Sequence, residues 1–500
     1  MKFRSIYIFF NSWLLLALSF LLFTSCSIPN QKARPYKSIK QIKSAVLDVT
    51  KNNTSKLRTD RKVSRIIASA ITPVENQRNQ IKFEWVGRDS IDPNVFDYVI
   101  RSSAVIRKNW NNNWNEYKGK GTPLIFLRKD QGDRFLMNAG EVMPVTAHIE
   151  KNDTEFKIKL FDTLDPKNSS EEIARDYTAP INYLTRRAKL IPKITAIVKT
   201  NQYMDGIGLH RMNPFDPNKI PVILIHGFKS NPTTWVNLIN QLQSDPKVRN
   251  RFQFWTFSYP TGIPILYSTM RLRNELNAMR KYYDPDENNK NLSNIVLVGH
   301  SMGGIIARLL NSTSSKEYSK WPPVGSNSFK IPIKSNELAK KMFRFKSQDY
   351  ITRSIFIATP HRGTKLASSG IAKMLSSVIQ VPFELQETFI NSLSLNPDIS
   401  FNDQQFISRM KSINNLRPKS NFIKYMQSSS IDPRIKTHSI IGIGKLGWWK
   451  KLESRNDFVV SYESAHLINS DSELTIAAWH DLNTDSETIS EVGRILKNHH

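Results

Sequence analysis

A serine flanked by glycines is the feature of this chain best suited to chemistry. Ser301 lies in the segment Gly-His-Ser-Met-Gly, residues 299–303. Residues 295–298 predict a buried strand before it, and the apolar residues 305–310 predict a helix after it. A strand, a tight turn and a helix hold a serine hydroxyl above a sheet edge, beside a helix N-terminus that favours developing negative charge. Ser301 is therefore the predicted nucleophile.

A serine hydroxyl is a poor nucleophile at neutral pH and needs a base that is itself oriented by an acid. The histidines that follow Ser301 within the same region are His361, His438, His466 and His480. Only His480 follows the last predicted strand and precedes the closing helix, where the base is expected when the chain order is nucleophile, acid, base. His480 is the predicted base.

The acid should follow the strand before the one that leads to His480. Asp457, in Asn-Asp-Phe-Val-Val, fits this position best, because it comes after a predicted strand over residues 437–443. Glu463 is the second candidate, and Asp471 and Glu473 fit less well. The sequence thus predicts a Ser301, Asp457 and His480 constellation.

Two backbone amides are predicted to form an oxyanion hole. The apolar run 221–225 predicts a strand buried on both faces, and His226-Gly227-Phe228 follows it at the edge of the sheet where ligands bind. The N–H groups of Phe228 and of Met302, directly after the nucleophile, are the expected donors. His226 itself is expected to have a structural role.

The elements that position these residues alternate between strands and helices. Further strands are predicted over residues 252–257, 350–358 and 474–478, and helices over residues 270–282 and 489–496. This alternation predicts a mostly parallel sheet with helices on both faces, an α/β fold, preceded by a smaller β-rich region.

The motifs also carry a family resemblance. The chain resembles an α/β-hydrolase of the lipase and GPI-inositol-deacylase-like group, in its bacterial lipoprotein form. The matching segments are ILIHGF at 223–228, FSYPTG at 257–262, GHSMGG at 299–304, ATPHRG at 358–363, NDFVV at 456–460 and SAHL at 464–467. The resemblance implies the α/β-hydrolase fold over residues 176–500, with Ser301 as nucleophile, Asp457 as acid and His480 as base. Phe458 departs from the family pattern, in which a glycine is commoner after the acid.

Residues 1–26 are predicted to be a lipoprotein signal peptide. Lys2 and Arg4 precede a mostly apolar stretch that ends at Cys26, the only cysteine of the chain. A lone cysteine in an exported chain has no internal disulfide to form, so Cys26 is the predicted lipidation site. A plain secretory signal or an uncleaved anchor is the alternative. Ser27 after the cysteine resembles the outer-membrane form in bacteria, so the expected location is the cell envelope.

The chain is strongly basic, with 71 Lys and Arg against 43 Asp and Glu and a net charge of +28. Such a charge favours anionic surfaces, although a generally basic compartment explains it equally well. Residues 31–66 are rich in Lys and Arg, and within residues 27–75 they predict a basic linker or an amphipathic helix on anionic lipid. No helix-turn-helix, RNP or zinc pattern accompanies the charge, so nucleic acid is not an expected partner.

Four regions are therefore expected: the signal at 1–26, the basic linker at 27–75, a β-rich accessory domain at 76–175 and the hydrolase domain at 176–500. Strands are predicted at 123–127, 142–149 and 154–160, and residues 176–199 have helical spacing. Insertions are expected at about 311–349 and 365–435. Their apolar segments suit either a lid over acyl chains or a helical excursion packed on the core.

The expected activity is hydrolysis of carboxylic esters, with lipids as the predicted substrates, by an exported and lipid-anchored serine hydrolase. The expected partners are the acyl ester and the membrane, reached through lipidated Cys26. No cofactor and no metal are expected. Two alternatives stay open: an acyltransferase that uses the same residues, and a non-catalytic envelope-binding protein on a hydrolase scaffold.

Overall fold

The computed structural model describes residues 80–106, 114–129, 132–151, 155–170, 172–314, 337–368, 411–444 and 455–500. The predicted signal segment with Cys26 and the basic segment 31–66 lie outside these residues. The middle of each predicted insertion, 315–336 and 369–410, lies outside them as well, including the apolar segments of the second insertion, for which a lid and a helical excursion were the two alternatives. Among the residues described, no helix combines the length and the apolar character that a bilayer crossing requires.

The N-terminal part forms a five-stranded sheet with the order β1-β6-β5-β4-β2. Its strands are β1 (Gln80–Val86), β2 (Tyr98–Arg101), β4 (Thr122–Arg128), β5 (Glu141–Lys151) and β6 (Glu155–Asp162). The three strands predicted in this region are confirmed as β4, β5 and β6. Their apolar side chains, Phe126, Met143 and Leu160 among them, form a small core on one face of the sheet. Short strands β3 (Glu116–Tyr117) and β7 (Arg175–Asp176) pair separately.

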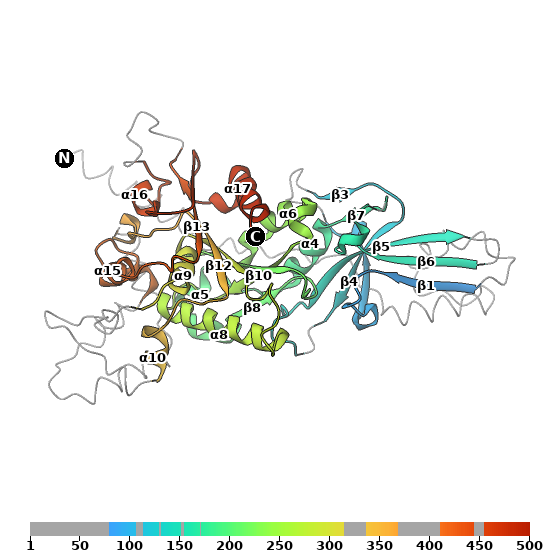
Figure 1. Cartoon of the computed structure of the whole chain (residues 1–500), viewed down its shortest axis with the longest axis horizontal. Helices are drawn as coiled ribbons and strands as arrows, with labels where there is room; N and C mark the ends of the chain where they lie inside the picture. Colours follow the sequence, from blue (N-terminus) through green and yellow to red (C-terminus); the bar gives the residue numbers. More distant parts are fainter. Residues whose placement is uncertain are drawn as a thin grey trace, which may run out of the picture. The chain divides into compact units, whose positions relative to one another are not determined.

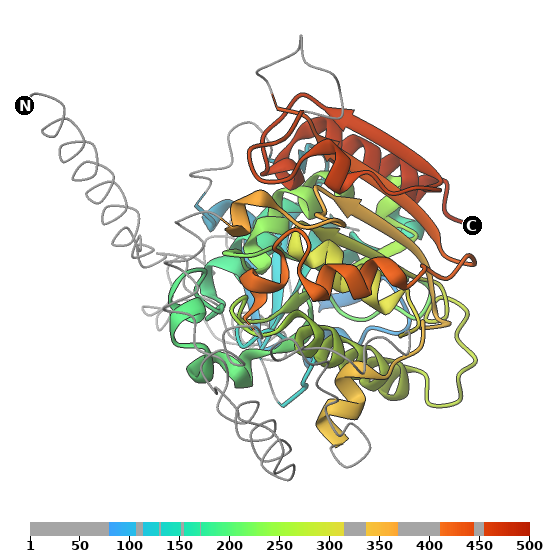
Figure 2. The same cartoon turned by 90° about the vertical axis from the view of Figure 1, so that its left-hand side faces the viewer.

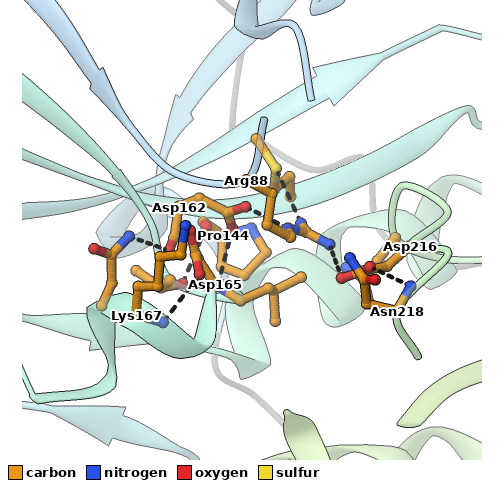
Figure 3. Close-up of polar contacts among 12 residues, drawn as sticks. Arg88, Pro144, Asp162, Asp165, Lys167, Asp216 and Asn218 are labelled. Atoms are coloured by element: carbon orange, nitrogen blue, oxygen red, sulfur yellow. Dashed lines mark hydrogen bonds and ion pairs between the residues drawn. The ribbon is translucent and has the colours of Figure 1, made fainter. Parts of the chain in front are cut away.

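A buried ion pair and a hydrogen bond join this sheet to the segment that leads into the second sheet. Arg88, just after β1, donates from Nε to Asp162 at 2.6 Å and from Nη1 to Asp216 at 3.1 Å (Figure 3). Lys219 donates to the carbonyl of Leu164 at 3.0 Å, and burial together with the neighbouring Arg88 lowers its pKa to about 8. Charges taken out of water require such partners, so the two parts of the chain are held in a fixed relation here.

A second set of buried ion pairs joins the same two parts. Arg211 donates to Asp133 at 2.7 Å and also pairs with Glu141 of β5. Its Nε donates to the phenol oxygen of Tyr283 at 2.9 Å. All three charged side chains are at most one-tenth exposed. Removing one of these partners would leave a buried charge unpaired, so the loss of this contact should lower the stability of the fold.

The second sheet has seven strands in the order β14-β13-β12-β11-β9-β10-β8. They are β8 (Gly208–Arg211), β9 (Ile220–Ile225), β10 (Phe252–Ser258), β11 (Ile295–His300), β12 (Ile351–Ile357), β13 (Lys436–Gly442) and β14 (Ser472–Ile476). All neighbours are parallel except β10 and β8. The six predicted strands of this region are confirmed, whereas β8 was not predicted. The result is the α/β-hydrolase arrangement, a mostly parallel sheet.

Helices cover both faces of the second sheet. In Figure 1, α6 (Val236–Ser244) and α17 (Ser486–Lys497) lie on one face, and α8 (Ile265–Tyr283) and α9 (Met302–Leu310) lie on the other. Figure 2 shows the last strands and α17, in red, side by side at one edge. The main apolar core lies between α8, α9 and the central strands, where every residue of β9 and β11 is buried.

The helix predicted over residues 176–199 is broken in the structure. It is replaced by α4 (Thr178–Arg187) and the single turn α5 (Thr195–Val198). Pro192 lies in the intervening segment, and a proline in a helix interior removes a hydrogen bond and clashes with the preceding turn. The helical spacing of apolar residues therefore extends beyond Arg187, where α4 ends.

The described parts of the two insertions are short helices. They comprise α10 (Glu337–Phe343), α14 (Ser412–Asn415) and α15 (Asn421–Ser428). Two further short helices are α7 (Pro246–Arg249) and α16 (Tyr462–Ala465). Phe422, Ile423 and Met426 of α15 are buried in the main core, and Arg308 of α9 donates to the carbonyl of Met426. This end of the second insertion is thus packed as part of the domain.

Candidate active site

Ser301 lies between the end of β11 and the start of α9, in a strained turn. Its φ and ψ are 54° and −120°, a left-handed conformation that few residues other than glycine adopt. The turn also requires two close backbone approaches. A Cβ on Gly299 would lie 2.5 Å from the Cα of Gly304, and one on Gly303 would lie 2.1 Å from the carbonyl oxygen of Ile225. The glycines of the motif are needed because no side chain fits at these positions.

A continuous hydrogen-bond chain links Ser301, His480 and Asp457. Nε2 of His480 lies 2.9 Å from Oγ of Ser301, and Nδ1 lies 2.7 Å from Oδ2 of Asp457. A carboxylate only accepts, so Nδ1 carries the hydrogen and Nε2 is left to accept from the serine hydroxyl. The side chain of Asp457 is 1% exposed and that of His480 is 19% exposed. The structure therefore brings the three sequence-predicted residues together in the order that activates a serine.

The loop that carries Asp457 is stabilised by its own backbone. Oδ1 of Asp457 accepts hydrogen bonds from the amides of Val459 at 2.9 Å and Val460 at 2.6 Å. Phe458 between them has a φ of 78°, the left-handed conformation that a glycine adopts without strain. Phe458 therefore holds a backbone conformation that a glycine would adopt without strain. Its ring is 67% exposed and contacts Trp479 with a centroid distance of 4.5 Å.

The alternative acids are engaged elsewhere. Asp471 pairs with Lys436 at 3.0 Å and accepts from the amide of Thr437. Glu473 contacts Nδ1 of His466 at 2.7 Å and the hydroxyl of Tyr462. Glu463 lies in α16 and is exposed. Among these carboxylates, Asp457 is the one that contacts His480.

The alternative histidines also have other surroundings. His361 is fully buried, and its ring stands edge-on to Phe356 at a centroid distance of 4.9 Å. His438 of β13 lies between Ser472 at 2.7 Å and Arg353 at 2.6 Å. Burial lowers the pKa of both histidines, to about 4 for His438, so they are held neutral. His480 is the one that reaches Ser301.

The segment after β9 lies directly against Ser301. A Cβ on Gly227 would be 3.0 Å from the Cβ of Ser301, so His226-Gly227-Phe228 passes close to the nucleophile. Met302 is the first residue of α9, where the backbone N–H has no acceptor within the helix. The segments that carry the predicted oxyanion donors, the amides of Phe228 and Met302, therefore lie next to Ser301.

Two residues of this region were not predicted from the sequence. The hydroxyl of Tyr259 donates to the carbonyl of His226 at 2.6 Å, and its ring stacks on the His226 ring at 4.4 Å. His300 contacts the backbone of His480. The motif shows that His300 lies beside the nucleophile. It does not show the contact with His480, because His480 lies 180 residues further along the chain.

His226 and the other potential metal ligands of this region form no metal-binding cluster among the described residues. Within the described ranges, no group of three or more His, Cys, Asp or Glu side chains is arranged to hold a metal ion. The neutral His226, whose pKa is lowered to about 4 by burial, is stacked on Tyr259 and has no recorded contact with Ser301.

The strand order of the second sheet and the strand-turn-helix at Ser301 define the class of fold: the chain has the α/β-hydrolase fold. Residues 216–320, which include the segment after β9 and the turn at Ser301, match the family model described as PGAP1-like alpha/beta domain. The family match thus agrees with the sequence resemblance over this part of the chain. No curated protein matches the chain.

Solved structures similar to this chain include three bacterial proteins. Against the mature lipase BlEst2 of Bacillus licheniformis the identity is 15%, the match covers 56% of this chain and 93% of that chain, and the TM-score is 0.34. The Staphylococcus hyicus lipase is 17% identical, the match covers 57% of this chain and 95% of that chain, and the TM-score is 0.34. EstA of Clostridium botulinum is 15% identical, the match covers 56% of this chain and 88% of that chain, and the TM-score is 0.33. Similarity at this level does not indicate a substrate.

Proposed function

We propose that this protein is a serine hydrolase that cleaves carboxylic ester bonds, with lipids as its substrates. The observation that carries the proposal is the chain from Ser301 through His480 to Asp457, with distances of 2.9 and 2.7 Å. Nucleophile and base within hydrogen-bond reach, with the base oriented by a third group, is the arrangement that makes a serine reactive. The strained backbone at Ser301 supports the same role, because such strain is retained at functional sites.

In the proposed mechanism Oγ of Ser301 attacks the ester carbonyl carbon, and Nε2 of His480 takes the hydroxyl proton. The tetrahedral intermediate then collapses, its bond to the alcohol breaks, and His480 returns the proton to the leaving oxygen. Water attacks the acyl-enzyme by the same route and releases the acid. Asp457 keeps the hydrogen on Nδ1 and stabilises the imidazolium that forms in each step.

The proposed oxyanion hole consists of the amides of Phe228 and Met302. Donors aimed at the developing negative charge contribute roughly 3 kcal/mol each in such sites. The support is the position of Gly227 against Ser301 and of Met302 at the N-terminus of α9. Both donors belong to the backbone, so this role is independent of the Phe228 and Met302 side chains.

Lipid substrates are proposed because apolar side chains are exposed on the loops next to this site. Phe458 follows Asp457, Trp479 precedes His480, and both rings are exposed to solvent. Leu366, two residues after Thr364, is 44% exposed, and Thr364 bonds the carbonyl of Val459 in the same loop. Exposed apolar groups gathered at one place are typical of binding surfaces for apolar ligands.

The test is turnover of p-nitrophenyl esters of rising chain length together with phospholipids. We expect activity to rise with chain length, and Ser301→Ala or His480→Ala to lower it by on the order of a millionfold, with little further loss in the double variant. Products formed with an added alcohol in place of water would indicate an acyltransferase. A wild-type protein that neither turns over esters nor reacts with a fluorophosphonate would instead be a non-catalytic binding protein.

We also propose that the protein is exported and anchored to the envelope through lipidated Cys26. The support is the sequence: a basic N-terminus, an apolar stretch and one cysteine directly after it. In Cys26→Ser, we expect labelling by a palmitate analogue to disappear and the protein to leave the membrane fraction. Labelling that persists in this variant would rule out acylation at Cys26.

A further inference from the structure

The histidine before the nucleophile contacts the backbone of the base. Nε2 of His300 lies 2.8 Å from the carbonyl oxygen of His480, and the two rings lie 5.0 Å apart between centroids. A carbonyl oxygen only accepts, so Nε2 of His300 carries the hydrogen and donates it. This contact joins the end of β11 to the loop after β14, across 180 residues of sequence.

The environment of His300 keeps its ring uncharged. The residue is 6% exposed, and Nδ1 has no hydrogen-bond partner among the described residues. Burial, and then the neighbouring His480, lower the pKa of His300 to about 3. The groups close enough to influence it are His480, Asp457 and His226. A neutral ring donates one fixed hydrogen bond and does not oppose the positive charge that His480 gains during turnover.

The contact gives His480 a second point of attachment, on its main chain. Asp457 holds the ring through Nδ1, whereas His300 holds the main chain of the same residue. Because Ser301 follows His300 directly, the anchor on the main chain starts one residue from the nucleophile. On its other side the ring lies against the segment after β9, since a Cβ on Gly227 would be 3.1 Å from Nδ1 of His300. The buried ring of His300 therefore lies between the loop that carries His480 and the segment after β9, directly beside Ser301.

We propose that His300 is a positioning residue, whose Nε2–H holds the carbonyl of His480 and so fixes the distance between His480 Nε2 and Ser301 Oγ. The proposal rests on the proposed function, because it assigns a role within that reaction. The contribution lies in the hydrogen bond and not in ring bulk. Loss of the donor should therefore loosen the base without changing how the substrate binds.

The experiment compares two replacements of similar length, His300→Gln and His300→Met. The glutamine amide can donate to the His480 carbonyl, whereas the methionine thioether cannot. We expect His300→Met to lower kcat by roughly 10- to 100-fold with KM unchanged, because small displacements of reacting groups cost about this much. His300→Gln should stay within about fivefold of the wild type, since its donor is restored. His466→Met, at a histidine bound to Glu473, is the matched control and should leave activity unchanged.

The rate at which a fluorophosphonate labels Ser301 is measured in the same variants and should follow kcat. Thermal melting checks folding, and His300→Leu provides a second variant without a donor if His300→Met does not fold. Equal activity of the Gln and Met variants, or a Met variant as active as the wild type, would overturn the role of His300 alone. A wild-type protein inert toward both esters and fluorophosphonate would overturn the proposed function and this role together.

Discussion

At the level of single residues, the carboxylate of Asp457 has two tasks. It holds Nδ1 of His480 at 2.7 Å through one oxygen and the amides of its own loop through the other. Asp457→Asn keeps the shape but allows His480 to take the wrong tautomer. We expect turnover of a soluble ester to fall by about ten-thousandfold while the melting temperature shows that the protein still folds.

The control for this prediction is Glu463→Gln. Glu463 is exposed and has no recorded contact with His480, so turnover should change by less than about tenfold, the scale of an indirect effect. If Glu463→Gln is the inactive variant and Asp457→Asn remains active, the acid has been assigned to the wrong residue.

Phe458 offers a separate test of backbone strain. Its φ of 78° costs a residue with a Cβ roughly 1 kcal/mol or more, and glycine avoids this cost. We expect Phe458→Gly to be more stable than Phe458→Ala by about 1 kcal/mol in urea unfolding, because both variants lose the ring but only alanine keeps the strain. Equal stability of the two variants would mean that the loop does not hold this conformation in solution.

At the level of elements, the parallel strands were predictable because each is a continuous apolar run. The residues that follow such strands meet at one sheet edge, and this made it possible to predict from the sequence that Ser301, Asp457 and His480 lie close together. The four-residue strand β8 was not predicted, because a run so short has no clear periodicity. The contact of His300 with His480 and the ion pairs of Arg88 depend on tertiary approach, for which the sequence has no local signal.

The buried ion pairs of Arg88 lead to a stability prediction. Asp162→Asn removes the closer carboxylate from Arg88, whose side chain is 9% exposed. Since this leaves the buried guanidinium with one of its two carboxylate partners missing, we expect the free energy of unfolding to fall by about 3 kcal/mol. Glu337→Gln, which removes the exposed pair with Lys340, should cost less than about 1 kcal/mol. A similar cost for both variants in chemical unfolding would contradict the structural role of the Arg88 contacts.

At the level of the whole molecule, several histidines are buried in their neutral form. Burial, together with neighbouring histidines or arginines for most of them, lowers the pKa values of His226, His300, His361, His438 and His499. The unfolded chain therefore binds more protons than the folded one between the usual pKa of about 6.5 and folded values near 4. Stability is thus fully present above pH 6.5 and is lost progressively as the pH falls toward 4.

The measurement is the melting temperature between pH 7.5 and 4. We expect it to fall steadily below about pH 6.5. His438→Gln removes one of these groups next to Arg353, so its melting temperature should depend less steeply on pH. A melting temperature that does not change down to pH 4.5 would contradict the neutral burial of these rings.

The central claim is that Ser301 is a nucleophile activated by His480. The most direct test is to label the full-length protein with a fluorophosphonate and to locate the adduct by mass spectrometry of its peptides. We predict a single adduct on Ser301, formed in the wild type, lost in Ser301→Ala and strongly slowed in His480→Ala. An adduct on another residue, or ester hydrolysis that continues in Ser301→Ala, would contradict the claim.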